Sequence, residues 1–241
     1  MPGTAASVSA APAEHVDTEV LERVYVWDIV VRLTHWVVAL SILILAFTGI
    51  YIGRPFYIPM GPVDEQFVMG TVKIVHFYTA IVFTLAVLVR VGWMIVGPRY
   101  ARWDQFVPAS PRRRKNVLTM LSFYTFFRRD PPLNVGHNPL AGLTYLTVFA
   151  LYFVMILTGL ALYSVDAGVS YMRVWGFLLP VFGGAQTARL IHHVTMWLIL
   201  GFFAHHIWSA ILMSRYEGHG LIDSMFSGYK FLPRGWRDRD E

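Results

Sequence analysis

The sequence predicts an all-α membrane protein, a bundle of four transmembrane helices with both termini in the cytoplasm. Two features of the 241 residues support this fold class: four long apolar runs, and basic residues gathered on one side of those runs. Composition agrees, because 15% of the residues are charged, whereas soluble domains carry about 25%. The mean hydropathy of +0.50 points the same way.

The four apolar runs cover residues 33–53, 72–97, 141–163 and 189–213. Each is close to the roughly 20 residues that a helix needs to cross about 30 Å of hydrocarbon. Helices are expected because backbone polar groups in lipid must find their partners within the segment. The sequence therefore predicts four membrane-spanning helices joined by three connections.

Basic residues indicate the orientation of these spans, because Lys and Arg favour the cytoplasmic side. Fifteen of the 20 lie on one side. They are Arg23, Arg32, Arg99, Arg102, Arg112, Arg113, Arg114, Lys115, Arg128, Arg129, Arg215, Lys230, Arg234, Arg237 and Arg239. The other side carries Arg54, Lys73, Arg173 and Arg189. The sequence pI of about 9.6 is therefore explained by the basic residues on the cytoplasmic side, and no nucleic-acid partner is expected.

Residues 23–232 form the predicted four-helix domain, and short polar segments precede and follow it. Residues 1–22 are small, polar and acidic, without the basic start and apolar run of a secretory signal. They are expected to form a disordered cytoplasmic extension. Residues 233–241 are expected to form a cytoplasmic tail.

Two segments between the spans are apolar but too short to cross a bilayer. Residues 117–129 follow a basic run at 112–115, so they are predicted to form an interfacial helix on the anionic leaflet. On the opposite side, residues 164–188 contain a short amphipathic stretch with Tyr171 and Trp175. Such aromatic residues favour the membrane interface.

Four histidines lie within the spans at spacings that suit two cofactors. His192 and His206 are fourteen residues apart, which places them on one helical face about 21 Å apart along the axis. The predicted orientation puts His76 and His192 near the outer surface, and His35 and His206 near the cytoplasm. Ionisable side chains inside a membrane span are rare and usually functional. Each pair could clamp one planar cofactor in the bundle core.

The chain contains no cysteine, which limits the cofactors it could hold. Iron–sulfur clusters ligated by this chain and covalently attached haem are excluded. The four histidines are therefore predicted as axial ligands of the iron in two haems b. A hydrogen bond to a neighbouring helix is the alternative for any single histidine. His193 and His205 point away from the shared face and are expected to have structural or supporting roles.

Basic residues within or beside the spans are candidates for contacts with the haems. Arg32 lies one turn before His35, and Arg90 lies fourteen residues after His76, so both are candidates to bind haem propionates. For Arg90, snorkelling to lipid phosphate is the alternative. Lys73 and Arg54 are weaker candidates at the outer haem.

Two similar strings, AFTGIYIG and ILTGLALY, place a Thr-Gly pair in the first and third spans. Small residues allow a haem or another backbone to approach closely. Simple helix packing explains these glycines equally well.

Several strings together resemble the b-type cytochrome subunit of membrane-bound nickel–iron uptake hydrogenases, in a wider group with formate dehydrogenase gamma subunits. The strings are YVWDIVVRLTHW (25–36), FTGIYIG (47–53), VGHNPLA (135–141), MILTGLALY (155–163), HHVTMW (192–197) and SMFSGYKF (224–231), with the helix of His76. The resemblance runs from about residue 22 to 232.

The resemblance implies that His35, His76, His192 and His206 are the axial ligands. It also implies an inner-membrane anchor for a hydrogenase small subunit and large subunit. Electrons would pass from the outer haem to the inner haem and then to quinone, and this chain would have no dihydrogen chemistry of its own.

The quinone site would lie near the inner haem, where His137 and Asn138 are candidates. The alternative for these residues is a helix cap at the start of the third span.

Other functions remain open at this point. The partner could be a formate dehydrogenase-like enzyme, or the chain could be a free-standing di-haem quinol oxidase or ferric reductase. A transporter that uses intramembrane histidines for protons predicts no haem at all.

Overall fold

Four helices are long and apolar enough to cross a membrane, as the sequence predicts. They are α1 (Ile29–Gly53), α2 (Val68–Val96), α4 (Pro139–Asp166) and α7 (Ala185–Glu217). The computed structural model describes residues 20–58, 60–62, 66–108, 111–129, 135–136, 138–166, 168, 170–218 and 220–236. Each helix begins before the predicted apolar run, and α4 and α7 also end after it, because helical hydrogen bonding continues into the polar flanks.

Asp28 illustrates how a cap sets such a boundary. Its Oδ1 accepts hydrogen bonds from the backbone N–H groups of Val30 and Val31, at 2.9 and 3.2 Å. These bonds satisfy two of the donors that the first turn leaves free. Its Oδ2 accepts a further bond of 3.1 Å from the indole of Trp93 in α2. One carboxylate therefore starts α1 and joins it to the end of α2.

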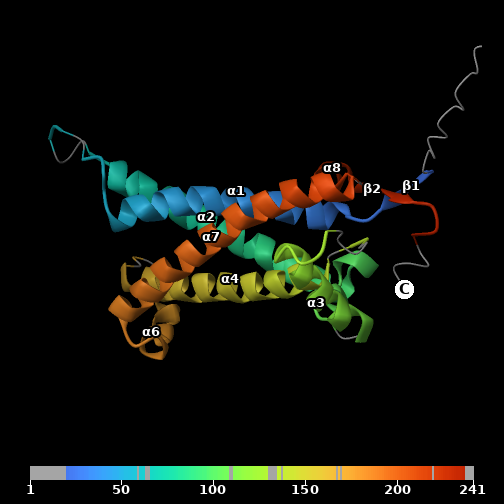
Figure 1. Ribbon diagram of the computed structural model, residues 1–241. Coiled ribbons are helices and arrows are strands. Elements are labelled where there is room, and N and C mark those ends of the chain that lie inside the picture. The colour runs from blue at the N-terminus through green and yellow to red at the C-terminus, as the bar shows by residue number, and fades with distance from the viewer. Residues whose placement is uncertain are drawn as a thin grey trace, which may run out of the picture.

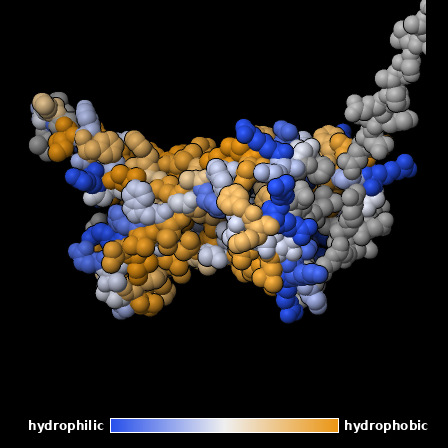
Figure 2. Space-filling view, in the orientation of Figure 1, coloured by the Kyte–Doolittle hydropathy of each residue, from blue (hydrophilic) through white to orange (hydrophobic). Residues whose placement is uncertain are grey.

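The helices pack chiefly as two pairs, α1 with α2 and α4 with α7. In Figure 1, α7 crosses the bundle obliquely, from α6 beside α4 to α8 beside the start of α1. A buried cluster takes residues from all four helices and holds the pairs together. Its members are Ile42, Phe83, Val87, Val148, Tyr152 and Ile199. Apolar side chains cover the middle of the bundle and hydrophilic ones gather at its ends (Figure 2), which suits a membrane environment.

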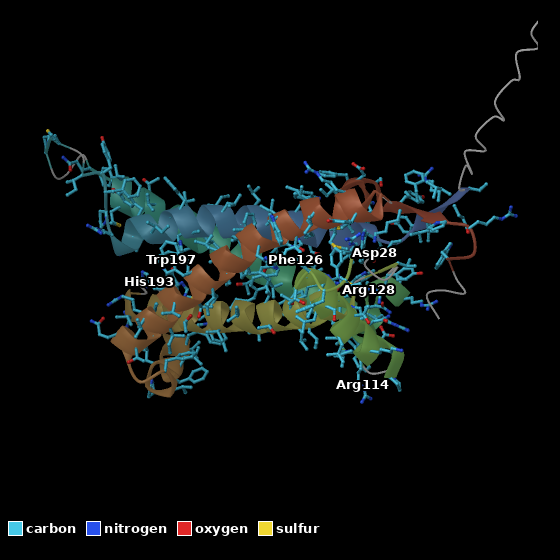
Figure 3. All side chains as sticks on the ribbon, in the orientation of Figure 1. Asp28, Arg114, Phe126, Arg128, His193 and Trp197 are labelled. Atoms are coloured by element: carbon cyan, nitrogen blue, oxygen red, sulfur yellow. The ribbon has the colours of Figure 1, made fainter. Side chains whose placement is uncertain are left out.

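The bundle has two distinct ends (Figure 1), which we call the terminal end and the loop end. The terminal end carries β1 (Leu21–Tyr25), η2 (Arg99–Ala101), η3 (Trp103–Gln105), α3 (Pro111–Tyr124), α8 (Leu221–Ser227) and β2 (Tyr229–Pro233). The loop end carries the connection from α1 to α2, α5 (Ser170–Arg173), η4 (Val174–Phe177) and α6 (Leu178–Val181). Figure 3 places His193 and Trp197 near the loop end, and Asp28, Arg114 and Arg128 near the terminal end.

A two-stranded antiparallel sheet joins the beginning and end of the described chain. β1 pairs with β2 in a register that sets Leu21 opposite Pro233 and Tyr25 opposite Tyr229. The extension expected over residues 1–22 and the tail expected over residues 233–241 are therefore wrong at these boundaries. Their boundary residues are ordered because each strand supplies the backbone partners of the other. Residues 1–19 and 237–241 lie outside the described part of the chain.

The sheet closes a small core at the terminal end. Its buried members are Val26, Trp27, Val31, Ala101, Val135, Leu232 and Trp236. The indole of Trp236 also donates a 3.0 Å hydrogen bond to Glu22 Oε2. Trp236 thus belongs to the folded domain, because burying its ring removes a large apolar surface from water.

The helix predicted over residues 117–129 is present as α3, but it begins earlier, at Pro111, and ends earlier, at Tyr124. Proline suits the first helical turn because its missing N–H would have no partner there. The chain then turns at Phe126, whose φ of 65° is left-handed and ends the helix. Phe126 and Phe127 are 89% and 90% exposed at this turn.

The buried hydrogen bond between Trp27 and Ser224 yields a prediction for stability. The indole of Trp27 donates to Ser224 Oγ at 3.1 Å, and Ser224 is fully buried. Ser224→Ala removes the hydroxyl that accepts this buried hydrogen bond, and the loss of such a bond costs about 0.5–1.5 kcal/mol. We expect a lower unfolding temperature in detergent, followed by tryptophan fluorescence. Ser227→Ala, at an exposed position of the same helix, is the control, and equal unfolding temperatures for both variants would contradict the prediction.

Candidate functional site

At the loop end, two histidines are each held by a threonine of the neighbouring helix. Nδ1 of His76 lies 2.8 Å from Thr48 Oγ1, which joins α2 to α1. Nδ1 of His192 lies 2.8 Å from Thr158 Oγ1, which joins α7 to α4. The same contact therefore occurs once within each of the two helix pairs.

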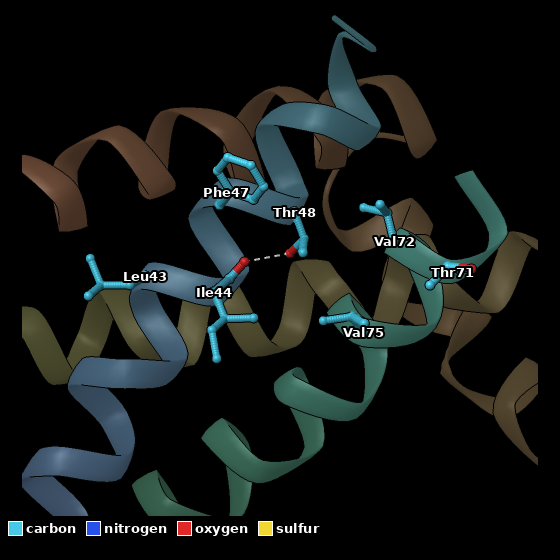
Figure 4. Close-up of a pocket in the computed structure, with 7 residues that line it drawn as sticks. All are labelled: Leu43, Ile44, Phe47, Thr48, Thr71, Val72 and Val75. Atoms are coloured by element: carbon cyan, nitrogen blue, oxygen red, sulfur yellow. Dashed lines mark hydrogen bonds between the residues drawn. The ribbon is translucent and has the colours of Figure 1, made fainter. Parts of the chain in front are cut away.

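The threonine hydroxyls also decide which ring nitrogen carries the proton. Thr48 Oγ1 donates to the Ile44 carbonyl at 2.7 Å (Figure 4), and Thr158 Oγ1 donates to the Val154 carbonyl at 2.7 Å. A hydroxyl has one hydrogen to donate. Each threonine must then accept from the imidazole Nδ1–H. Nε2 of both histidines is left with its lone pair, the form in which neutral imidazole binds a metal.

The glycine that follows each threonine makes room for the imidazole ring. A Cβ on Gly49 would lie 3.4 Å from Cε1 of His76, and a Cβ on Gly159 would lie 3.4 Å from Cε1 of His192. A methyl group at either position would therefore already touch the ring, and a larger side chain would press on it. The repeated Thr-Gly string thus forms two sockets for histidines. The sequence contains the repeated Thr-Gly string, but by itself the string indicates room for a haem or a neighbouring helix and not a contact with histidine.

The faces that carry these two histidines turn towards the same side of the bundle. The Cβ position of Gly49, which touches His76, also lies 4.0 Å from Sδ of Met196. Met196 follows His192 by one helical turn and so lies on the same face of α7. The two sockets therefore bring His76 and the face of His192 together at the loop end.

At the terminal end, His35 of α1 and His206 of α7 face each other. Their ring centroids are 6.1 Å apart and the ring planes are inclined at 60°. His206 stacks on Phe202, with centroids 5.6 Å apart, and its Nδ1 lies 3.5 Å from the Tyr145 hydroxyl. Nδ1 of His35 is buried and has no hydrogen-bond partner among the described residues. The pairing predicted from depth is therefore present at this end.

The donor set fits a metal ion held between two imidazoles. Metal–imidazole bonds of about 2.0–2.1 Å place two coordinating nitrogens about 4 Å apart across one ion. The ring centres must lie further apart than that, as the 6.1 Å between His35 and His206 allows. Because His192 and His206 share one face of α7, the two pairs form two levels separated by about 21 Å.

The remaining two histidines of α7 point elsewhere, as the helical face predicts. Nδ1 of His193 donates to the Arg189 carbonyl at 2.8 Å. The His193 ring packs on α1, with Nε2 2.8 Å from the position of a Cβ on Gly53. His205 is exposed and lies beside Trp208, with ring centroids 5.7 Å apart.

The two arginines proposed for propionates make protein contacts at the terminal end. Arg90 is 8% exposed, and its Nη1 donates to the Ala101 carbonyl at 3.2 Å. Its guanidinium lies 5.5 Å from the ring centroid of Phe106. Snorkelling of Arg90 to lipid is therefore wrong, because the connection after α2 folds over it. Nη1 of Arg32 donates to the Phe226 carbonyl in α8, and its Nε is buried without a partner among the described residues.

Asn138 caps α4, which agrees with the alternative that the sequence left open. Its Oδ1 accepts a 2.7 Å hydrogen bond from the Ala141 N–H. The connection that covers Arg90 packs against this turn, where a Cβ on Gly142 would lie 2.9 Å from the Gln105 carbonyl oxygen. His137, the other quinone candidate, lies outside the described residues.

An apolar groove of about 450 Å³ runs between α1 and α2 beside Thr48 (Figure 4). Its lining is Leu43, Ile44, Phe47, Thr48, Thr71, Val72 and Val75. The lining contains no histidine or carboxylate, so the groove itself is not a metal site.

Comparisons with known proteins identify the family of this chain. A family model described as prokaryotic cytochrome b561 matches residues 26–228. A probable Ni/Fe-hydrogenase B-type cytochrome subunit of Cupriavidus necator is 36% identical, with 87% of this chain and 88% of that protein covered. Its counterpart in Bradyrhizobium diazoefficiens is 35% identical, with 85% of each chain covered. A probable Ni/Fe-hydrogenase 1 B-type cytochrome subunit of Escherichia coli K12 is 30% identical, with 86% and 90% covered.

These matches confirm the resemblance that the sequence strings carry. They extend over most of the chain and include all four spans with their histidines. The chain therefore belongs to the prokaryotic cytochrome b561 family and is a multi-pass protein of the bacterial inner membrane.

Proposed function

We propose that this chain is the di-haem b membrane anchor of a nickel–iron hydrogenase and passes electrons from that enzyme to the quinone pool. The observation that carries the proposal is the pair of histidine levels on α7, each completed by a histidine of another helix. At the loop end both imidazoles present a free Nε2 because Thr48 and Thr158 accept the Nδ1 protons. This is the donor set that bis-histidine haem requires.

His76 and His192 would hold one haem, and His35 and His206 the other. When bound, haem supplies reversible one-electron chemistry at the iron. The chain supplies the ligands, an apolar surrounding that excludes water, and two fixed levels along the bundle. Arg32, with its buried Nε, remains a candidate to bind a propionate at the terminal end.

The partner is inferred from relatives whose names describe subunits of Ni/Fe-hydrogenases. Electrons would enter at the loop end, which is the surface nearest to His76 and His192. The positive-inside rule puts that end outside the cytoplasm and both termini inside. A formate dehydrogenase-like partner or a free-standing quinol-linked reductase uses the same histidines, so co-purification with hydrogenase subunits distinguishes these alternatives.

The histidine pairs predict the haem content of substitution variants. His76→Ala or His192→Ala should reduce two haems per chain to one, because either substitution removes an axial ligand of the loop-end haem. His35→Ala or His206→Ala should remove the other haem. Reduced-minus-oxidised spectra, normalised to purified protein, measure this content. His193→Ala is the control and should retain both haems. If His193→Ala lost a haem while His192→Ala kept both, the assignment of the ligands would be contradicted. Absence of haem from the unsubstituted protein would favour a transporter.

The chain has no cysteine, so single introduced cysteines test orientation and docking cleanly. Ile58 lies at the loop end and is 77% exposed, and Trp103 lies at the terminal end and is 57% exposed. We expect Ile58→Cys to crosslink to the hydrogenase small subunit, and to react with a membrane-impermeant thiol reagent in spheroplasts. Trp103→Cys should react with the reagent only in inverted vesicles, and it should not crosslink to the small subunit. Crosslinks confined to Trp103→Cys would overturn the docking surface.

Quinone is proposed to bind at the terminal end, near His137 and Asn138. Asn138→Ser keeps a good helix cap while it removes the carboxamide. We expect this variant and His137→Ala to slow quinone reduction about tenfold, the effect of losing about 1.4 kcal/mol of binding. Both haems should remain bound and reducible by dihydrogen. A normal rate in both variants would leave Asn138 with the capping role alone.

A further inference from the structure

The two histidine pairs differ in the hydrogen bonds that their Nδ1 atoms make. At the loop end, both Nδ1 atoms lie 2.8 Å from a threonine oxygen, well within the usual range for N–H···O bonds. At the terminal end, Nδ1 of His206 is 3.5 Å from the Tyr145 hydroxyl. Nδ1 of His35 is buried and has no partner among the described residues. The loop-end imidazoles are therefore the better hydrogen-bonded pair.

Donation from Nδ1–H makes an imidazole a more basic ligand. A more basic ligand favours the oxidised, more positively charged iron, and hydrogen bonding around the ligands is one of the means by which proteins set haem potentials. We propose that Thr48 and Thr158 are positioning residues that lower the reduction potential of the loop-end haem below that of the terminal-end haem. This inference rests on the proposed function, in which both pairs hold haem b.

Basic residues lie at both ends of the bundle, so positive charge alone does not set one pair apart from the other. Lys73 and Arg54 lie near the loop-end histidines, and Arg32 and Arg90 lie at the terminal end. The contrast between the pairs lies in the hydrogen bonds. Its consequence is directional: electrons delivered at the loop end would move downhill towards the terminal end.

The test replaces each hydroxyl by a methyl group in the intact hydrogenase complex. Thr48→Val and Thr158→Val remove the acceptor without changing charge, and redox titration of the haem absorbance reads both potentials. At a fixed ambient potential, the reduced-to-oxidised ratio of the loop-end haem should rise about threefold per hydroxyl removed. For a one-electron centre, that is a shift of about 28 mV to more positive potential. The terminal-end haem should not move.

Two further sets of variants make the result specific. Thr84→Val is the matched control, because Thr84 Oγ1 donates to the Ala80 carbonyl at 2.7 Å as Thr48 does to its own helix. This bond involves no histidine, so both potentials should stay unchanged. Thr48→Ser and Thr158→Ser keep the hydroxyl and should retain the original loop-end potential. His76→Ala and His35→Ala identify which absorbance belongs to which level.

Several outcomes would overturn the inference. A loop-end potential above the terminal-end potential in the unsubstituted protein does so directly. So do valine variants that retain both haems with both potentials unmoved, or serine variants that shift as far as the valine variants. If the valine variants lose the loop-end haem, the serine variants and the order of the two potentials decide the question. A chain that binds fewer than two haems refutes the proposed function together with this inference, whereas two haems without a shift refute the inference alone.

Discussion

An imidazole N–H buried among membrane-spanning helices is costly unless the protein supplies its acceptor, because no bulk water is available there. His76 and His192 meet this constraint through threonines on the neighbouring helix of each pair. Each contact fixes the rotation of one helix against the other, since a turn of either would separate ring and hydroxyl. The packing of α1 with α2, and of α4 with α7, is therefore tied to the orientation of the histidines.

The loop end repeats the same threonine–histidine contact in both helix pairs. In each pair the first helix supplies a threonine and then a glycine, and the second helix supplies the histidine. The terminal end has no such repeat in the described part of the chain. There α8 and β2 meet the start of α1 through Trp27 and Ser224, and the connection after α2 covers Arg90. The two ends thus offer their histidines different surroundings.

The sequence predicted the features that depend on short-range patterns. Four apolar runs gave the four spans, and a fourteen-residue spacing gave the shared face of His192 and His206. The sockets could not be predicted in the same way, because they depend on which faces of two helices meet. The sequence suggested lipid or a propionate as the partner of Arg90. Its contact with the Ala101 carbonyl could not be predicted, because the local pattern does not determine the path of that connection.

The same limit applies to the sheet, because its strands are far apart along the chain. Tyr25 and Tyr229 are partners 204 residues apart, and strand alternation in either segment alone gives no sign of the other. Accordingly, the sequence prediction places Trp236 in a tail beyond the domain, and the first residues of β1 in a disordered extension. These residues are structured because they are buried and paired only once the whole domain has assembled.

The pairing of β1 with β2 also has a consequence for assembly during synthesis. β1 precedes all four membrane helices and β2 follows them. At about 5–20 residues per second, β1 waits about 10–40 s for its partner to leave the ribosome. Throughout that interval the first helix lies in the membrane without the closure that β2 and α8 provide. The terminal end is therefore the last part of the bundle to close, and the level of His35 and His206 is completed after the level of His76 and His192.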